Sequence, residues 1–173
     1  YAPDCEPCAV VVFATPVPSS GAPFSPLSFL STLDKGPGTL AWVGSGGQTV
    51  AGGRYLADIA SLRALGGDVI PSLGGWSADQ GGTEIADSCK DVGAIASAYE
   101  LLITTYGVTR LDMDVEGRSL TRTAGIDRRN KAIKLVEDWA AAPGGTLQVR
   151  HPLPTTRDGP GGSFAVQVPF APV

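Results

Sequence analysis

Three carboxylates stand at alternate positions in the segment 111–117, which reads Leu-Asp-Met-Asp-Val-Glu-Gly. Successive side chains of an extended strand point to opposite faces, so Asp112, Asp114 and Glu116 would share one face. Like charges this close repel each other, which favours the protonated form of at least one carboxyl group. Acid–base catalysis and cation binding both use such clusters, whereas a solvated strand edge is the simplest interpretation of the spacing alone.

A second candidate stretch, Ser72-Leu73-Gly74-Gly75-Trp76, closes a predicted strand over residues 68–73. A strand predicted at 39–43 also ends in glycines, at Gly44–Gly47. Functional residues of parallel α/β folds gather at the carboxyl ends of the strands, so we expect these segments to lie beside the acids. Pro71 weakens the strand prediction, because proline has no N–H for a sheet ladder.

The elements that must position these residues alternate between strand and helix patterns. Short apolar runs predict strands at 9–14, 39–43, 68–73, 109–116 and 147–152, and helical spacing predicts helices at 54–65, 91–106 and 126–141. The predicted inward faces are Leu56, Ile59, Leu62 and Leu65 in the first helix, Val92, Ile95, Ala96, Tyr99, Leu102, Ile103 and Tyr106 in the second, and Ile126, Ile133, Val136 and Trp139 with Ala140 in the third. Residues 15–38 are rich in Pro, Ser and Gly and predict a long connection, with a short helix near Leu27–Leu33. This order predicts a parallel sheet with right-handed crossovers.

Composition narrows the classes of protein. The 173 residues suffice for one domain and not for two, and 43% of them are hydrophobic, as in a globular protein. A net charge of −4 argues against nucleic acid as a partner, and no apolar run is long enough to span a membrane. Cys5 and Cys8 have the spacing of half a zinc site, but no second cysteine pair follows and His151 is the only histidine, so we expect no structural metal and no cofactor. A disulfide with Cys89 stays open.

Three segments together resemble the family 18 glycoside hydrolases, the chitinase-type barrels, and especially their secreted bacterial members. Segment 111–117 resembles the fourth-strand signature that ends in the family's catalytic Glu, and segment 68–76 resembles its third-strand Ser-x-Gly-Gly motif. Residues 39–53 are similar to the family's second strand and loop, and the resemblance extends over about 39–156. One position departs from the signature: Thr109 stands where the family usually has a further Asp.

The resemblance implies a retaining, substrate-assisted glycosidase, which is an exception to the usual pair of carboxylates. Glu116 would be the general acid and base, Asp114 would orient the substrate's 2-acetamido group, and Asp112 would share a proton with Asp114. Repulsion between neighbouring carboxylates is what would keep such an acid protonated at mild pH. The residues expected to bind substrate are Trp76, Trp42, Ser72, Gly74 and Gly75, although both tryptophans also fit a core position.

The implied fold is a single (β/α)8 TIM-barrel domain over residues 1–173, of which this sequence accounts for only five or six β/α units. Such a barrel needs about 200 residues at minimum, and after residue 152 only Phe164–Val168 offers a further strand. We therefore expect that residues of a larger enzyme are absent from this sequence. The implied protein is a secreted, extracellular, monomeric chitinase that acts on chitin or N-acetylglucosamine oligomers.

Several alternatives stay open. The scaffold also serves as a non-catalytic carbohydrate-binding or inhibitor protein, a fate associated with loss of the terminal Glu, which is present here as Glu116. An inactive fragment would keep the acids without the far wall of the cleft. The Asp-x-Asp-x-Glu spacing also fits a divalent metal site, but no phosphate-binding glycine loop accompanies it. Ser72 is a poor nucleophile candidate, because no nucleophile elbow surrounds it.

Overall fold

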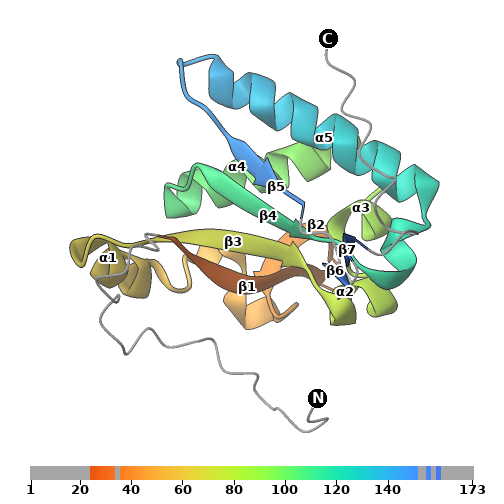
Figure 1. The fold of residues 1–173 in the computed structure, drawn as a ribbon, viewed down its shortest axis with the longest axis horizontal. Helices are drawn as coiled ribbons and strands as arrows, with labels where there is room; N and C mark the ends of the chain where they lie inside the picture. The colour runs from red at the N-terminus through yellow and green to blue at the C-terminus, as the bar shows by residue number, and fades with distance from the viewer. Residues whose placement is uncertain (1–23, 34–35, 152–154, 157–158, 161–173) are drawn as a thin grey trace, which may run out of the picture.

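The computed structural model describes residues 24–33, 36–151, 155–156 and 159–160. Five strands form one sheet in the order β2-β1-β3-β4-β5, and helices pack against it (Figure 1). The strands are β1 (Phe24–Leu33), β2 (Gly36–Trp42), β3 (Asp68–Gly74), β4 (Arg110–Asp114) and β5 (Gln148–Arg150). The helices are α1 (Leu56–Ala64), α2 (Trp76–Gly81), α3 (Ile85–Ser88), α4 (Val92–Tyr106) and α5 (Thr123–Ala141), with short 3-10 turns η1 (Gly46–Gln48), η2 (Val50–Gly52) and η3 (Gly117–Leu120). A separate small hairpin pairs β6 (Thr155–Thr156) with β7 (Gly159–Pro160).

The sheet is mostly parallel: β1 pairs with β3, β3 with β4 and β4 with β5 in parallel, which confirms the predicted α/β class. The prediction of a wholly parallel sheet is wrong at β1 and β2, which pair antiparallel. Only two residues separate these strands in the sequence, and so short a connection can join antiparallel neighbours alone. The described strands form an open sheet, so the closed eight-stranded barrel stays a prediction.

The short helix predicted near Leu27–Leu33 is wrong, because these residues belong to strand β1. Leu27 and Leu30 are both buried, and their spacing of three residues is typical of a helix. The register between β1 and β3 shifts between these two leucines, which lets both point into the core from an extended chain. The strand predicted at 9–14 and the apolar stretch 164–168 lie outside the described residues.

Pro71 lies inside β3, a central strand of the sheet, and the sheet is irregular around it. The ladder with β1 shifts register after the pair of Leu27 and Pro71, and the ladder with β4 begins only at Ser72. A proline therefore fits where regular pairing is already interrupted. The predicted strand is confirmed despite it.

Helices α4 and α5 lie side by side over the sheet (Figure 1). The Asp91 carboxylate caps α4 by accepting the N–H groups of Gly93 and Ala94 at 2.8 and 3.1 Å, and Gly107 ends the helix with a φ of 59°. Most of the predicted inward residues of α4 are buried, namely Ile95, Ala96, Tyr99, Leu102 and Tyr106, whereas Val92 and Ile103 are partly buried. No helix among the described residues is long and apolar enough to cross a membrane.

The inward faces of the other two helices are only partly as predicted. In α1, Ile59 and Leu62 are buried, but Leu56 and Leu65 are 44% and 66% exposed, because this short helix covers β3 with one narrow stripe. In α5, Ile133 and Val136 are buried, whereas Trp139 is 38% exposed. Residues four apart stay aligned on a helix, so Ala140 continues the stripe of Val136 and Trp139 falls at its margin.

Candidate active site

Strand β4 separates acids from apolar residues. Leu111 and Met113 are 1% and 2% exposed and join the core beneath α4 and α5. Asp112 and Asp114 point to the opposite face, where they are partly exposed, and Glu116 lies two residues beyond the end of the strand. The alternation predicted from the sequence is therefore confirmed.

The carboxyl group of Asp114 has a raised pKa. The pKa of its carboxyl is raised to about 6, first by burial and then by the neighbouring Glu116 and Asp112 carboxylates and a hydrogen bond to the Glu116 side chain. The expectation that one of the three carboxyls becomes easier to protonate is confirmed. At mildly acidic pH the Asp114 carboxyl can therefore hold a proton.

Ser72 supports Asp112 from the next strand. The parallel register places Ser72 of β3 opposite Asp112 of β4, and the Ser72 hydroxyl donates to Asp112 Oδ2 at 2.7 Å. Ser72 is only 2% exposed. In this structure the hydroxyl orients an acid, and the direct substrate contact predicted for Ser72 has no support from its position.

Gly74 and Gly75 allow the end of β3 to lie against the backbone of Asp114. A Cβ atom on Gly74 would stand 2.4 Å from the Asp114 carbonyl oxygen, and the φ of Gly74 is +101°. The N–H of Gly75, whose φ is +82°, donates to the same carbonyl at 2.7 Å. A side chain at Gly74 would therefore push β3 away from β4, the strand that carries Asp112 and Asp114.

The two predicted tryptophans occupy different environments. Trp42 is 1% exposed, its Nε1 donates to the Tyr106 hydroxyl at 2.8 Å, and its ring meets the edges of Tyr55 and Tyr106. Its position is that of a core residue and argues against stacking on a ligand. Trp76, the first residue of α2, is 52% exposed. It lies beside Gly117, the residue that follows Glu116 in the sequence.

Sequence reasoning missed Asp79, a fully buried residue of α2. Its Oδ2 accepts a hydrogen bond from the backbone N–H of Glu116, and burial raises the pKa of its carboxyl to about 6. The one signal in the sequence was that Asp79 lies four residues after Gly75. One turn of helix after that glycine would bring its side chain back toward the ends of the strands. Nothing in the local pattern showed which strand end it would meet.

A buried polar network lies next to Asp79. Arg129 of α5 forms a salt bridge with Glu84 at 3.0 Å, with both side chains at most 5% exposed. The Asp87 carboxylate accepts hydrogen bonds from the Ser119 hydroxyl at 2.6 Å and from Arg122 at 2.9 Å. These contacts tie α3, η3 and α5 together behind the acidic strand.

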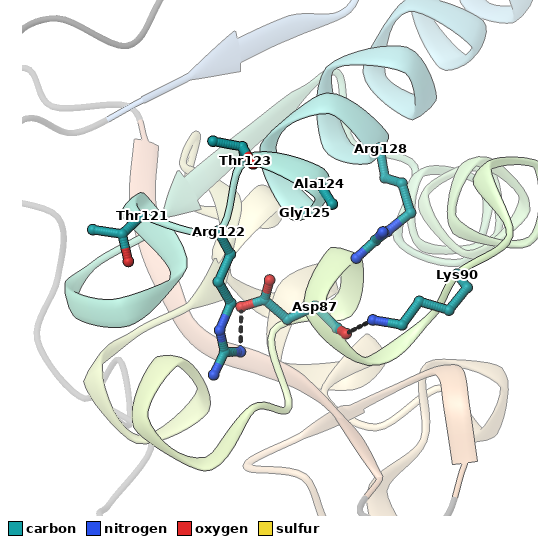
Figure 2. A pocket seen from close by; sticks show the side chains of 8 residues that line it. All are labelled: Asp87, Lys90, Thr121, Arg122, Thr123, Ala124, Gly125 and Arg128. Atoms are coloured by element: carbon teal, nitrogen blue, oxygen red, sulfur yellow. Dashed lines mark hydrogen bonds and ion pairs between the residues drawn. The ribbon is translucent and has the colours of Figure 1, made fainter.

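A hollow of about 390 Å³ opens at the start of α5. Figure 2 shows Arg122, Lys90 and Arg128 gathered around Asp87. Lys90 donates to the Asp87 carbonyl oxygen at 2.8 Å, and Arg128 donates to the Ala86 carbonyl oxygen. None of the three acids of the β4 segment lines this hollow, so it is distinct from the candidate site.

Cys89 is buried and forms no disulfide within the described residues, and Cys5 and Cys8 lie outside them. Over the same ranges, no group of three or more His, Cys, Asp and Glu side chains is arranged to hold a metal ion.

Two proteins to which this chain is similar in sequence carry the name of chitinases. No protein-family model matches the chain. It is 34% identical over 96 residues to the probable bifunctional chitinase/lysozyme of Escherichia coli strain K12, which is 56% of this chain and 10% of that protein. It is also 34% identical over 96 residues to Endochitinase 11 of Metarhizium anisopliae, covering 18% of that protein. The chain therefore spans less than a fifth of either relative.

Solved structures show the same likeness in fold. Active domain 2 of a chitinase from Pyrococcus furiosus superposes with a TM-score of 0.60 at 22% identity, over 76% of this chain and 38% of that one. This domain has also been solved with chito-oligosaccharides bound. A GH18 chitinase from Pseudoalteromonas aurantia gives a TM-score of 0.54 at 16% identity, over 75% of this chain and 47% of that one. In sequence over about half of its length, and in fold, this chain is similar to part of a family 18 chitinase.

Proposed function

We propose that this chain carries the acid cluster of a chitinase-like glycoside hydrolase, which cleaves β-1,4 bonds between N-acetylglucosamine units. The observation that carries the proposal is the row of three carboxylates at the end of β4, in which Asp114 stands between two other acids with a pKa raised to about 6. Relatives named as chitinases support the substrate class, and so does the related domain solved with chito-oligosaccharides.

The proposed reaction divides the work among the three acids. Glu116 gives its proton to the glycosidic oxygen as the bond from C1 to that oxygen breaks. The carbonyl oxygen of the substrate's own 2-acetamido group forms a bond to C1, and Asp114 orients this group and stabilises the oxazolinium ion. Water then attacks C1 as the bond from C1 to the acetamido oxygen breaks, and it gives a proton to Glu116, so the product keeps its anomeric configuration. Asp112 adjusts the charge on Asp114 by sharing a proton with it.

The proposed substrate contacts follow from exposure. Trp76 offers an exposed indole beside the segment that carries Glu116, where a sugar ring could stack. Ser72, Gly74 and Gly75 would affect substrate binding indirectly. Ser72 orients Asp112, and the two glycines let β3 lie close to the backbone of Asp114. An enzyme acting on a polymer as large as chitin would work outside the cell, which agrees with the expected secretion.

The test is the release of reducing ends from chitin oligomers by the wild-type chain and by Glu116→Gln. General acid–base groups contribute about 10²- to 10⁴-fold to rate, so we expect a loss of that order with oligomer binding retained. Glu137→Gln on α5 is the matched control, because it makes the same substitution away from β4, and it should keep wild-type activity.

The other outcomes separate the alternatives. Equal activity of wild type and Glu116→Gln would show that another residue is the acid. If neither protein cleaves and both bind, the chain is a carbohydrate-binding protein without hydrolysis. If neither cleaves nor binds, the proposed function is wrong for this chain.

A further inference from the structure

Asp79 is a buried carboxylate whose position packing alone does not explain. The residue is fully buried, Oδ2 accepts the Glu116 N–H, and Oδ1 has no hydrogen-bond partner among the described residues. Burial of a carboxylate oxygen without a partner is costly, and an apolar residue of similar size would avoid that cost. The carboxylate is therefore better explained by its contact with Glu116.

The backbone around Val115 is held at two points by the start of α2. The Gly75 N–H donates to the Asp114 carbonyl oxygen at 2.7 Å, and Asp79 accepts the Glu116 N–H on the other side of Val115. Asp79 is itself fixed to Gly75, because its N–H donates to the Gly75 carbonyl oxygen at 3.1 Å. Segment 75–79 thus holds both peptide groups that flank Val115.

The sheet itself does not hold Glu116. The ladder of β4 with β3 ends at Asp114, and its ladder with β5 ends at Asp112. Beyond Asp114, the first backbone donor that a side chain from another element accepts is the Glu116 N–H. Asp79, and not the sheet, therefore holds the N–H of Glu116.

We propose that Asp79 is a positioning residue, which fixes the backbone of Glu116 so that the Glu116 carboxyl meets Asp114. The inference rests on the proposed function, in which Glu116 is the general acid. A displacement of a reacting group by about 1 Å can cost about 10²-fold in rate. Protonation of Asp79 at Oδ1 leaves Oδ2 as an acceptor, so the contact is independent of the charge on Asp79.

The kinetic test compares Asp79→Ala with Asp79→Asn. Alanine removes the acceptor and should lower kcat about 10- to 100-fold, with KM within about twofold of wild type. Asparagine keeps an oxygen that can accept the Glu116 N–H and should stay within about threefold of the wild-type kcat. Asp91→Ala is the matched control, since it also removes a carboxylate that accepts backbone N–H groups, but at the start of α4. It should leave kcat unchanged.

Two kinetic outcomes would overturn the proposal. One is a wild-type kcat in Asp79→Ala. The other is an Asp79→Asn variant as slow as Asp79→Ala, which would show that the charge and not the acceptor matters.

A titration followed by NMR tests the same contact without any activity. Glu116 contributes to the raised pKa of Asp114, so release of Glu116 in Asp79→Ala should lower the Asp114 midpoint from about 6, while Asp79→Asn should not change it. In the wild type, the Glu116 amide should be protected from hydrogen exchange. An unprotected Glu116 amide overturns the proposal even if Asp79→Ala fails to fold. If no chitin oligomer is cleaved while both NMR results hold, the proposed function is wrong and the contact between Asp79 and Glu116 stands.

Discussion

Asp112, Asp114 and Glu116 lie along one edge of the site but meet different neighbours. Asp112 accepts a hydrogen bond from Ser72, Asp114 lies half-buried between two other acids, and the Glu116 backbone is held by Asp79. Side chains alternate between the two faces of any extended strand, so the spacing of the acids was enough to predict that they share a face. Ser72 and Asp79 lie 40 and 37 positions from the acids that they contact, so no local pattern could identify them.

The two tryptophans offer a test at the residue scale. Trp42→Phe removes the indole N–H that donates to Tyr106 and leaves a small cavity, so it should lower the free energy of unfolding by about 1–3 kcal/mol with unchanged affinity for chitin oligomers. Trp76→Ala, at an exposed position, should change stability by less than about 1 kcal/mol and weaken oligomer binding about fivefold or more. Urea denaturation and calorimetric titration measure the two effects, and the reverse pattern would contradict both assignments.

At the scale of elements, the close approach of β3 to β4 brings the site together. Parallel pairing sets Ser72 opposite Asp112 and Gly74 opposite Asp114, and the next residue starts the turn into α2. The sequence predicted both strands, and it predicted that Gly74 and Gly75 end the first of them. It could not predict that Gly74 touches the Asp114 carbonyl, because that contact requires the register between the strands.

Gly74→Ala tests this approach. The added Cβ would stand 2.4 Å from the Asp114 carbonyl oxygen, at a φ of +101° that alanine rarely adopts. We expect a loss of about 3 kcal/mol or more, or failure to fold. Gly46→Ala is the control, since a Cβ there meets no atom within 4 Å, and it should stay within about 0.5 kcal/mol of wild type. Urea unfolding midpoints of the two variants decide the matter, and equal midpoints would refute the predicted clash.

At the scale of the whole molecule, folding gathers charged groups behind the acidic strand. The salt bridge of Glu84 and Arg129 joins the start of α3 to α5, and Asp87 joins α3 to η3. Asp79 lies beside this network, and its pKa, like that of Asp114, is raised to about 6. The stability of the fold is therefore coupled to the protonation of groups at the candidate site.

The direction of this coupling follows from the raised pKa of Asp114. Between its ordinary pKa of 3.8 and about 6, the folded state binds more protons than the unfolded state, so this group lowers stability as pH rises through that window. Asp114→Asn should remove a pH-dependent loss of about 1–3 kcal/mol. Urea unfolding of both proteins at about pH 4.5 and pH 7 measures it. The lowered pKa of His151 acts in the opposite sense in both proteins, so it cancels in the comparison. If wild type and Asp114→Asn lost the same stability between these two pH values, the raised pKa of Asp114 would be contradicted.

The sequence by itself determined the features that depend on neighbours along the chain. These are the alternation in β4, the cap and end of α4, and the glycines that close β3. Only the tertiary structure decided that residues 24–33 form a strand paired with β2, that Trp42 is buried against Tyr106, and that Asp79 reaches Glu116. Each of these depends on the register between strands or on packing across the sheet, which joins residues that lie far apart in the sequence.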